Sequence, residues 1–254
     1  MAVALRKQFQ QQTLPNVSFG PFRFLEALPW LVMATALRVI AFGGGLVALP
    51  ALIAANIAVT HAFLVVAQRS IELQQGKTGL GALDFAEQFR LSRAVLWRIA
   101  LLMAAVACAL AGAGFTSLAP HMMVGLDGMA FDQHTDIGKF WSALIAVLVL
   151  LMTIDAERHQ GRVSFVNALR EMMRRGLWIG ATVAVLGAVY LGLGLGQGWV
   201  RSAIWNFWQI SSASQWLKNP VYFTFIFSFA MLRLWITLLI VTYGLKQSYL
   251  NEAD

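Results

Sequence analysis

Three polar residues in otherwise apolar stretches could carry chemistry: Arg233, His61 and Asn56. Arg233 lies twelve residues after Val221, inside a long apolar run, and His61 and Asn56 lie in a second run that ends near Gln68. A guanidinium in such surroundings can hold an anionic group, bond to backbone carbonyls or contact a lipid headgroup. We therefore take these three residues as the candidate polar site within the apolar part of the chain.

The carboxylates lie outside the middle of the apolar runs, in loops, tails or at helix edges. Proton- or sodium-coupled transport usually relies on a carboxylate or a broken helix near the middle of the membrane. The sequence has neither acidic residue type at the depth of Arg233, which disfavours a self-contained secondary transporter. Acid–base chemistry would have to use carboxylates of connecting segments, such as Asp84, Glu87, Asp155 and Glu157, and no motif marks them for catalysis.

Residue types that bind metals gather once in the sequence, at His121, Asp127, Asp132, His134 and Asp136. Their spacing matches neither HExxH nor a paired Cys/His site. We therefore expect a polar loop here and no metal. The nucleophile motif GxSxG is also absent from the sequence. We predict no catalytic residues and no cofactor.

The composition places these residues in a membrane protein. Of the 254 residues, 59% are hydrophobic and 12% are charged, and the mean hydropathy is +0.67. Soluble domains carry about twice this share of charged residues. The same figures exclude a disordered chain, a coiled coil and a disulfide scaffold. The formal net charge of +7 is explained by membrane topology, so we expect no nucleic-acid partner.

An all-α, polytopic transmembrane helix bundle is the predicted fold class. One span needs about 20 apolar residues, and the run from 24 to 68 is long enough for two, joined by a turn at Gly43–Gly45. Glycine suits such a turn because it accepts positive φ. The alternative for this run is an interfacial helix followed by one span, which would give five spans in total. The predicted parts are a cytoplasmic N-terminal tail (1–23), the bundle (24–244) and a cytoplasmic C-terminal tail (245–254), and the six predicted spans cover about residues 24–42, 46–67, 97–118, 138–154, 177–196 and 221–244.

The distribution of positive charge sets the predicted orientation. Segments 69–98 and 155–175 each carry five Lys or Arg residues, whereas 119–139 carries one and 198–220 carries two. Cytoplasmic loops are enriched in Lys and Arg, so the two basic segments and both tails are expected inside. This strong bias favours a bacterial inner membrane. Arg38, one turn before the glycines, is expected to reach the outer membrane surface.

Both basic segments end in an amphipathic stretch that leads into a span, at residues 83–97 and 164–178. In each, a Phe precedes an Arg by five residues and a Leu-Trp pair follows. This similarity is explained by an internal duplication or by a general preference for Arg near phosphates and Trp near headgroups. We expect the bilayer, with its anionic lipid headgroups, to be the partner of these helices. On the outer side, the Trp-rich segment Gly198–Asn219 is expected to lie flat at the membrane surface.

Small residues recur at every fourth position around the fifth predicted span, where they would let another backbone approach closely. This predicted packing ridge consists of Gly176, Gly180, Ala184, Ala188, Gly192 and Gly196. A similar stripe follows the third span at Ala100, Ala104, Cys108 and Gly112. We expect these helices to pack within the bundle or, alternatively, to bind another subunit.

Two basic stretches share a layout: AQRSIELQQGKTGLGALDFAEQFR (67–90) and AERHQGRVSFVNALREMMRRGLW (156–178). With these stretches, the chain resembles the six-helix bacterial inner-membrane proteins typified by YciC-like proteins. In such families a span is followed by a basic, glycine-containing cytoplasmic connection and then by an amphipathic Phe/Arg helix. The resemblance implies no catalytic residues.

These observations favour a non-enzymatic integral inner-membrane protein that acts as a scaffold or accessory subunit of a larger complex. A membrane-protein partner or a homo-oligomer is then expected. The alternative is a transporter or lipid-handling protein that contacts an anionic group through Arg233. A membrane-embedded enzyme that uses loop carboxylates is a third hypothesis.

Overall fold

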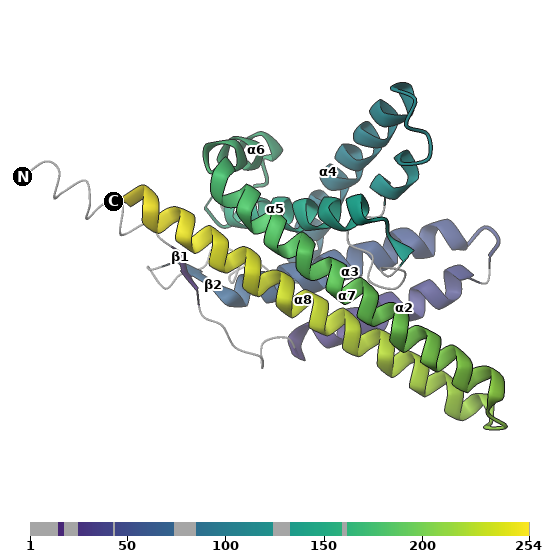
Figure 1. The fold of residues 1–254 in the computed structure, drawn as a ribbon. Coiled ribbons are helices and arrows are strands. Elements are labelled where there is room, and N and C mark those ends of the chain that lie inside the picture. Colours follow the sequence, from purple (N-terminus) through teal and green to yellow (C-terminus); the bar gives the residue numbers. More distant parts are fainter. Residues whose placement is uncertain are drawn as a thin grey trace, which may run out of the picture.

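The computed structural model describes residues 15–17, 25–42, 44–73, 85–123, 133–158 and 162–253. In these ranges the chain is helical apart from one short antiparallel pair, β1 (Pro15–Val17) with β2 (Ile71–Leu73), in which Asn16 lies opposite Glu72. The helices assemble into a bundle around α5 (Asp136–Arg158) (Figure 1). The prediction of an all-helical bundle is confirmed at this level.

Two helices, α2 (Leu28–Phe42) and α3 (Ala48–Ser70), form a hairpin at the start of the bundle. Gly44 and Gly45 have φ of +74° and +76°, a backbone region that favours glycine. The turn therefore lies where the glycines predict it, although Gly43 is outside the described residues. At 15 residues, α2 is about 22 Å long, which is shorter than the hydrocarbon core of about 30 Å.

Among the described residues, four helices are long and apolar enough to cross a membrane, which indicates a multi-pass membrane protein; α2 and α3 are not among them, and the apolar segment of α3 covers only Ala48–Ala62. The four are α4 (Phe85–Gly112), α5, α7 (Gly176–Ile210) and α8 (Gln215–Ala253). The predicted spans at 138–154, 177–196 and 221–244 lie inside α5, α7 and α8. The predicted span at 97–118 is displaced, because its apolar segment runs from Phe89 to Gly112. The chain then turns at Gly114, which has φ +91°, into the short helix η2 (Ala119–Met123).

The long helices differ greatly in how much of them the rest of the chain covers. In α5, 78% of the apolar window is buried, whereas in α4 only 17% is buried. A helix that is apolar on all sides belongs in a core, and α5 packs against α3, α6, α7 and α8. The outer half of α4 instead stands clear of the other helices (Figure 1). The core of the bundle is thus built around α5.

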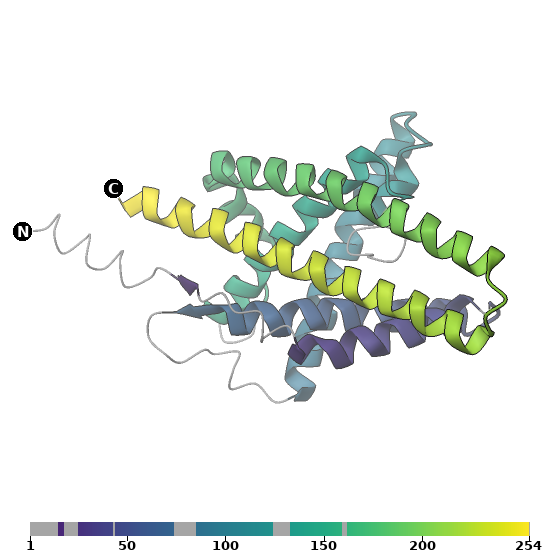
Figure 2. The ribbon, with the colours of Figure 1, turned by 60° about the horizontal axis from the view of Figure 1, so that its bottom comes forward.

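A hairpin of α7 and α8 replaces the surface segment expected at Gly198–Asn219. The two helices have 35 and 39 residues and are joined by residues 211–214. Their lengths of about 52 and 58 Å exceed the 40–45 Å or so of a bilayer with its headgroups. Lys218 ties α8 to the end of α7 through a 2.7 Å bond from Nζ to the Trp208 carbonyl. In both views the α7–α8 turn lies toward the same end as the α2–α3 turn (Figure 2).

The two basic amphipathic stretches adopt different structures. The first is the beginning of α4 and continues without a break into the apolar segment. The second forms a separate helix, α6 (Phe165–Arg174), which is divided from α7 at Arg175. The backbone N–H of Arg175 bonds to the carbonyls of Glu171 and Met173, which closes α6. Their similar sequences therefore do not produce a repeated structural unit.

Candidate functional site

Arg233 lies at the junction of three helices. Its side chain projects from α8, is only 6% exposed and donates from Nη2 to the Ser142 Oγ of α5 at 2.6 Å. The guanidinium carbon also lies 4.9 Å from the ring centroid of Tyr190, on α7. Cation–π attraction is strongest where the cation is desolvated. The cation thus connects α5, α7 and α8 directly.

Hydroxyl groups extend this contact. Thr237 Oγ1 donates to the Arg233 carbonyl at 2.6 Å, and it lies 2.5 Å from the Tyr190 hydroxyl. Because Thr237 has a single hydroxyl hydrogen, Tyr190 is the donor in the second bond. We call Arg233, Ser142, Tyr190 and Thr237 the arginine cluster. Each of these four residues is less than 9% exposed.

His61 belongs to a different group of side chains. Its Nδ1 lies 2.7 Å from the Ser92 Oγ of α4, and its ring meets Trp30 of α2 edge-on, with centroids 4.2 Å apart. Phe89 lies farther away, at 6.3 Å. His61 is 1% exposed. This histidine cluster joins α2, α3 and α4.

Asn56 bonds within its own helix, since its Nδ2 donates to the Leu52 carbonyl at 2.9 Å. The three residues predicted to form one polar site therefore have hydrogen-bond partners on different helices. Sequence reasoning missed Ser142 and Tyr190. The i, i+4 spacing of Arg233 and Thr237 was visible in the sequence, because such residues are neighbours on a helix.

Arg38, which was predicted to reach the outer membrane surface, is covered by the rest of the bundle, with 6% exposure. The reason is that α2 packs along α3 and also meets α8, so that this part of α2 is covered.

The predicted packing ridge faces away from the rest of the chain. A Cβ added at Gly176, Gly180, Gly192 or Gly196 would meet no atom within 4 Å, and Ala184 and Ala188 are exposed. The expectation that the ridge packs inside the bundle is therefore wrong for this chain by itself. The ridge is therefore an exposed stripe of small residues on α7 among the described helices.

Other glycines make the close contacts between helices. A Cβ at Gly187 would overlap the Phe140 ring, and one at Gly194 would lie 2.6 Å from Lys139 Cε, both on α5. A Cβ at Gly244 of α8 would overlap the Thr182 side chain of α7. α7 therefore packs closely against α5 at Gly187 and Gly194, and against α8 at Gly244.

The cluster of possible metal ligands is only partly described, since Asp127 and Asp132 lie outside the described residues. His134 is buried, and its carbonyl accepts a 2.8 Å bond from Lys139 Nζ. Lys139 also approaches Asp136 Oδ1 at 3.4 Å. Among the described residues, no group of three or more His, Cys, Asp or Glu side chains could hold a metal ion.

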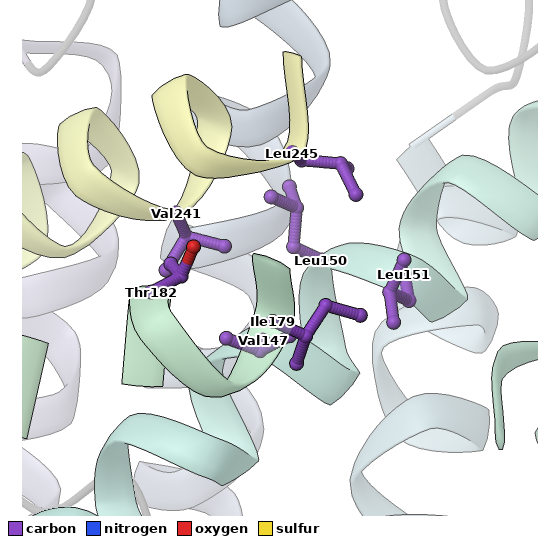
Figure 3. Close-up of a pocket in the computed structure, with 7 residues that line it drawn as sticks. All are labelled: Val147, Leu150, Leu151, Ile179, Thr182, Val241 and Leu245. Carbon is purple, nitrogen blue, oxygen red and sulfur yellow. The ribbon is translucent and has the colours of Figure 1, made fainter. Parts of the chain in front are cut away.

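A pocket between α5, α7 and α8 is almost entirely apolar. Its cavity volume is about 10 Å³, and Thr182 supplies the one polar side chain in its lining (Figure 3). The Thr182 hydroxyl donates to the Trp178 carbonyl at 2.8 Å. A cavity of this size has room for about one water molecule, and its lining offers no charge for a polar substrate. The residues that line it are Val147, Leu150, Leu151, Ile179, Thr182, Val241 and Leu245.

Of the three candidate residues, Arg233 and His61 therefore contact other helices, whereas Asn56 bonds within its own. Comparison of the chain with protein-family models, curated proteins and solved structures gives no match.

Proposed function

We propose that this chain is a non-enzymatic scaffold or accessory subunit of a larger complex in a bacterial inner membrane. The observation that carries the proposal is the outward-facing ridge of α7. Lipid tails are as apolar as leucine, so helices associate in membranes through close packing, to which small residues are suited. A ridge of six small residues that the chain's own helices leave uncovered offers a contact for another transmembrane helix.

The buried polar groups also support a structural role. The guanidinium of Arg233 is held by Ser142 and Tyr190, and His61 is held by Ser92. Hydrogen bonds between buried polar groups on different helices favour one arrangement of those helices. We infer that both clusters hold the helices in register so that the outer faces keep their shape.

A transporter or lipid-handling protein is the second candidate function. It is favoured by one observation, the burial of a guanidinium among membrane-spanning helices, where ionisable residues commonly mark a functional path. The pocket described above does not extend this idea, since no charged residue lines it. The variants Arg233→Ala and Arg233→Met distinguish this candidate from the scaffold function.

We further propose six spans with both termini in the cytoplasm, in the layout that resembles YciC-like proteins. The proposal counts the α2–α3 hairpin as two spans, although α2 is short, and it follows the excess of Lys and Arg in 69–98 and 155–175. The common end of the α2–α3 and α7–α8 turns is consistent with it (Figure 2).

Cysteine labelling tests this topology. Leu46 is 98% exposed beside the glycine turn, so Leu46→Cys in a Cys108→Ala background should react with an impermeant maleimide in intact cells. Arg162→Cys, at an exposed position before α6, is the matched control and should react only after the membrane is opened. Labelling of Leu46→Cys only after opening would contradict the six-span arrangement.

Bulky substitutions on the ridge test the scaffold function. Ala184→Ile with Ala188→Ile should reduce the amount of co-purifying protein by roughly tenfold, since overpacking costs about 1–3 kcal/mol. Val185→Ile, next to the ridge and also exposed, should leave it unchanged. The measurement is quantitative mass spectrometry after gentle extraction, with the thermal midpoint of each variant as a check on folding. Equal recovery of the same partners by all variants would rule out the ridge.

A further inference from the structure

The helix α6 is fixed to the bundle at its N-terminal end by a buried carboxylate. Asp155, at the end of α5, accepts bonds from the Ser164 backbone N–H at 2.9 Å and from Asn167 Nδ2 at 3.3 Å. Ser164 itself caps the helix by accepting from the Asn167 N–H at 3.3 Å. Asp155, which sequence analysis named as a possible acid–base group, therefore positions a helix.

The other end of α6 is fixed by Arg175. Its Nε donates to Glu171 Oε2 at 3.1 Å, and its Nη1 donates to the Ser248 Oγ of α8 at 3.3 Å. Arg175 is buried, with 7% exposure. Glu171 is the single acidic residue in 162–175, and it forms an ion pair with the buried Arg175.

The two faces of α6 have different characters. The inner face is apolar: Ala168 is 1% exposed and Phe165 and Met172 pack against the core. The outer face combines apolar and basic side chains at helical spacing. Val166 and Met173 are 62% and 68% exposed, and Arg170 and Arg174 are exposed beside them. We call Val166, Arg170, Met173 and Arg174 the outer face of α6.

The position of α6 relative to the spans identifies what this face meets. It connects the end of α5 to the start of α7, where Leu177 is 91% exposed and Trp178 is 41% exposed. A Trp at such a point is typical of the headgroup level. The helix lies at the opposite end of α7 from the α7–α8 turn (Figure 1). A short helix that joins two candidate spans, α5 and α7, would lie at the headgroup level of a bilayer that surrounds them.

We infer that the outer face of α6 binds the anionic phospholipids of the membrane in which the bundle sits. Val166 and Met173 enter the boundary between headgroups and acyl chains, and the arginine stems lie over them while the guanidinium groups reach the phosphates. Charge complementarity selects lipids with net negative charge over zwitterionic ones. This inference requires membrane insertion but does not depend on the scaffold function.

Hydrogen exchange of the full chain in two kinds of nanodisc tests it. One contains phosphatidylcholine alone, and the other contains equal parts of phosphatidylcholine and phosphatidylglycerol. Each basic residue near an anionic surface contributes roughly a fivefold gain in binding. We therefore expect amide exchange in 166–174 to slow by about tenfold or more with phosphatidylglycerol, whereas exchange in the middle of α5 should not change.

Two variants distinguish a lipid contact on α6 from a general effect of charge. Arg170→Gln with Arg174→Gln should abolish most of the added protection, and Arg93→Gln, which removes an exposed charge from α4, should preserve it. The inference fails if phosphatidylglycerol gives no added protection, if the double variant keeps it, or if Arg93→Gln loses it equally. Protection of α6 in native membranes but in neither nanodisc would also overturn it, because the face would then meet a protein.

Discussion

Replacing Gly244 with alanine is expected to lower the free energy of unfolding by about 2 kcal/mol, since overpacking a tight contact costs about 1–3 kcal/mol. A Cβ at this position would overlap Thr182 Oγ1 and lie 3.0 Å from Thr182 Cβ and Cγ2. Thr182 is short, buried and bonded to the Trp178 carbonyl, so moving its hydroxyl aside would break that bond. The α7 and α8 backbones would have to separate.

The control is Gly180→Ala, on the ridge of α7. Nothing lies within 4 Å of a Cβ there, and alanine favours a helix over glycine by up to about 1 kcal/mol. The two substitutions are chemically identical and should have opposite signs. The thermal midpoint of each purified variant in one detergent measures this. Equal effects would show that α7 and α8 do not meet at Gly244.

A second substitution tests whether the contact itself is the cause. Thr182→Ala removes the atoms that a Cβ at Gly244 would overlap, so Gly244→Ala combined with Thr182→Ala should recover most of the loss. Residues in contact commonly show coupling energies of about 0.5–3 kcal/mol in a double-mutant cycle. Simple additivity of the two changes would contradict the close approach.

The sequence predicted the helical class and the places of several long helices, because an apolar run and a break are local properties, whereas four helices rather than the predicted six are long and apolar enough to span a membrane in the described residues. The turn at Gly44 and Gly45 is an example, since positive φ is a requirement of the backbone at those residues. The Trp-rich segment 198–219 was predicted to lie flat at the membrane surface, but it forms the ends of α7 and α8 and the turn between them. Its indole rings do favour a membrane surface, but the helical spacing continues to Ile210, and the helices extend through the segment.

The face that each helix turns inward could not be predicted in the same way. In a soluble protein, polar residues mark the outer face, but in a membrane both the lipid side and the packed side are apolar. Small residues therefore recur on α7 at the exposed ridge and at Gly187 and Gly194, which contact α5. The four-residue spacing of the ridge was visible in the sequence, but the sequence did not show which face of α7 packs against α5.

Arg233 is buried, and its partners lie 91 and 43 positions away in the sequence, at Ser142 and Tyr190. Serine and tyrosine are common at many positions of membrane helices. Only the packing of α5, α7 and α8 identifies the two that meet the guanidinium. The sequence therefore identified Arg233 as a candidate but could not identify the residues that contact it.

Replacing Arg233 with alanine is expected to cost about 3 kcal/mol of stability, from a lost charge-assisted hydrogen bond, a lost cation–π contact and a cavity. Replacing it with methionine fills the space with an apolar side chain. A buried ionic group exchanged for a well-packed apolar one is often nearly neutral, so Arg233→Met should remain close to the wild-type thermal midpoint. Tyr190→Phe keeps the ring under the guanidinium and should lose only about 1 kcal/mol.

These variants also separate the two proposed functions. If Arg233 only joins helices, Arg233→Met should keep both its stability and its co-purifying proteins, whereas Arg233→Ala loses both together. If Arg233 holds an anionic lipid or metabolite, native mass spectrometry should find that molecule on the wild-type protein and not on the stable Arg233→Met variant. That second result would contradict a purely structural arginine cluster, because methionine supports the packing of the three helices but cannot bind an anion.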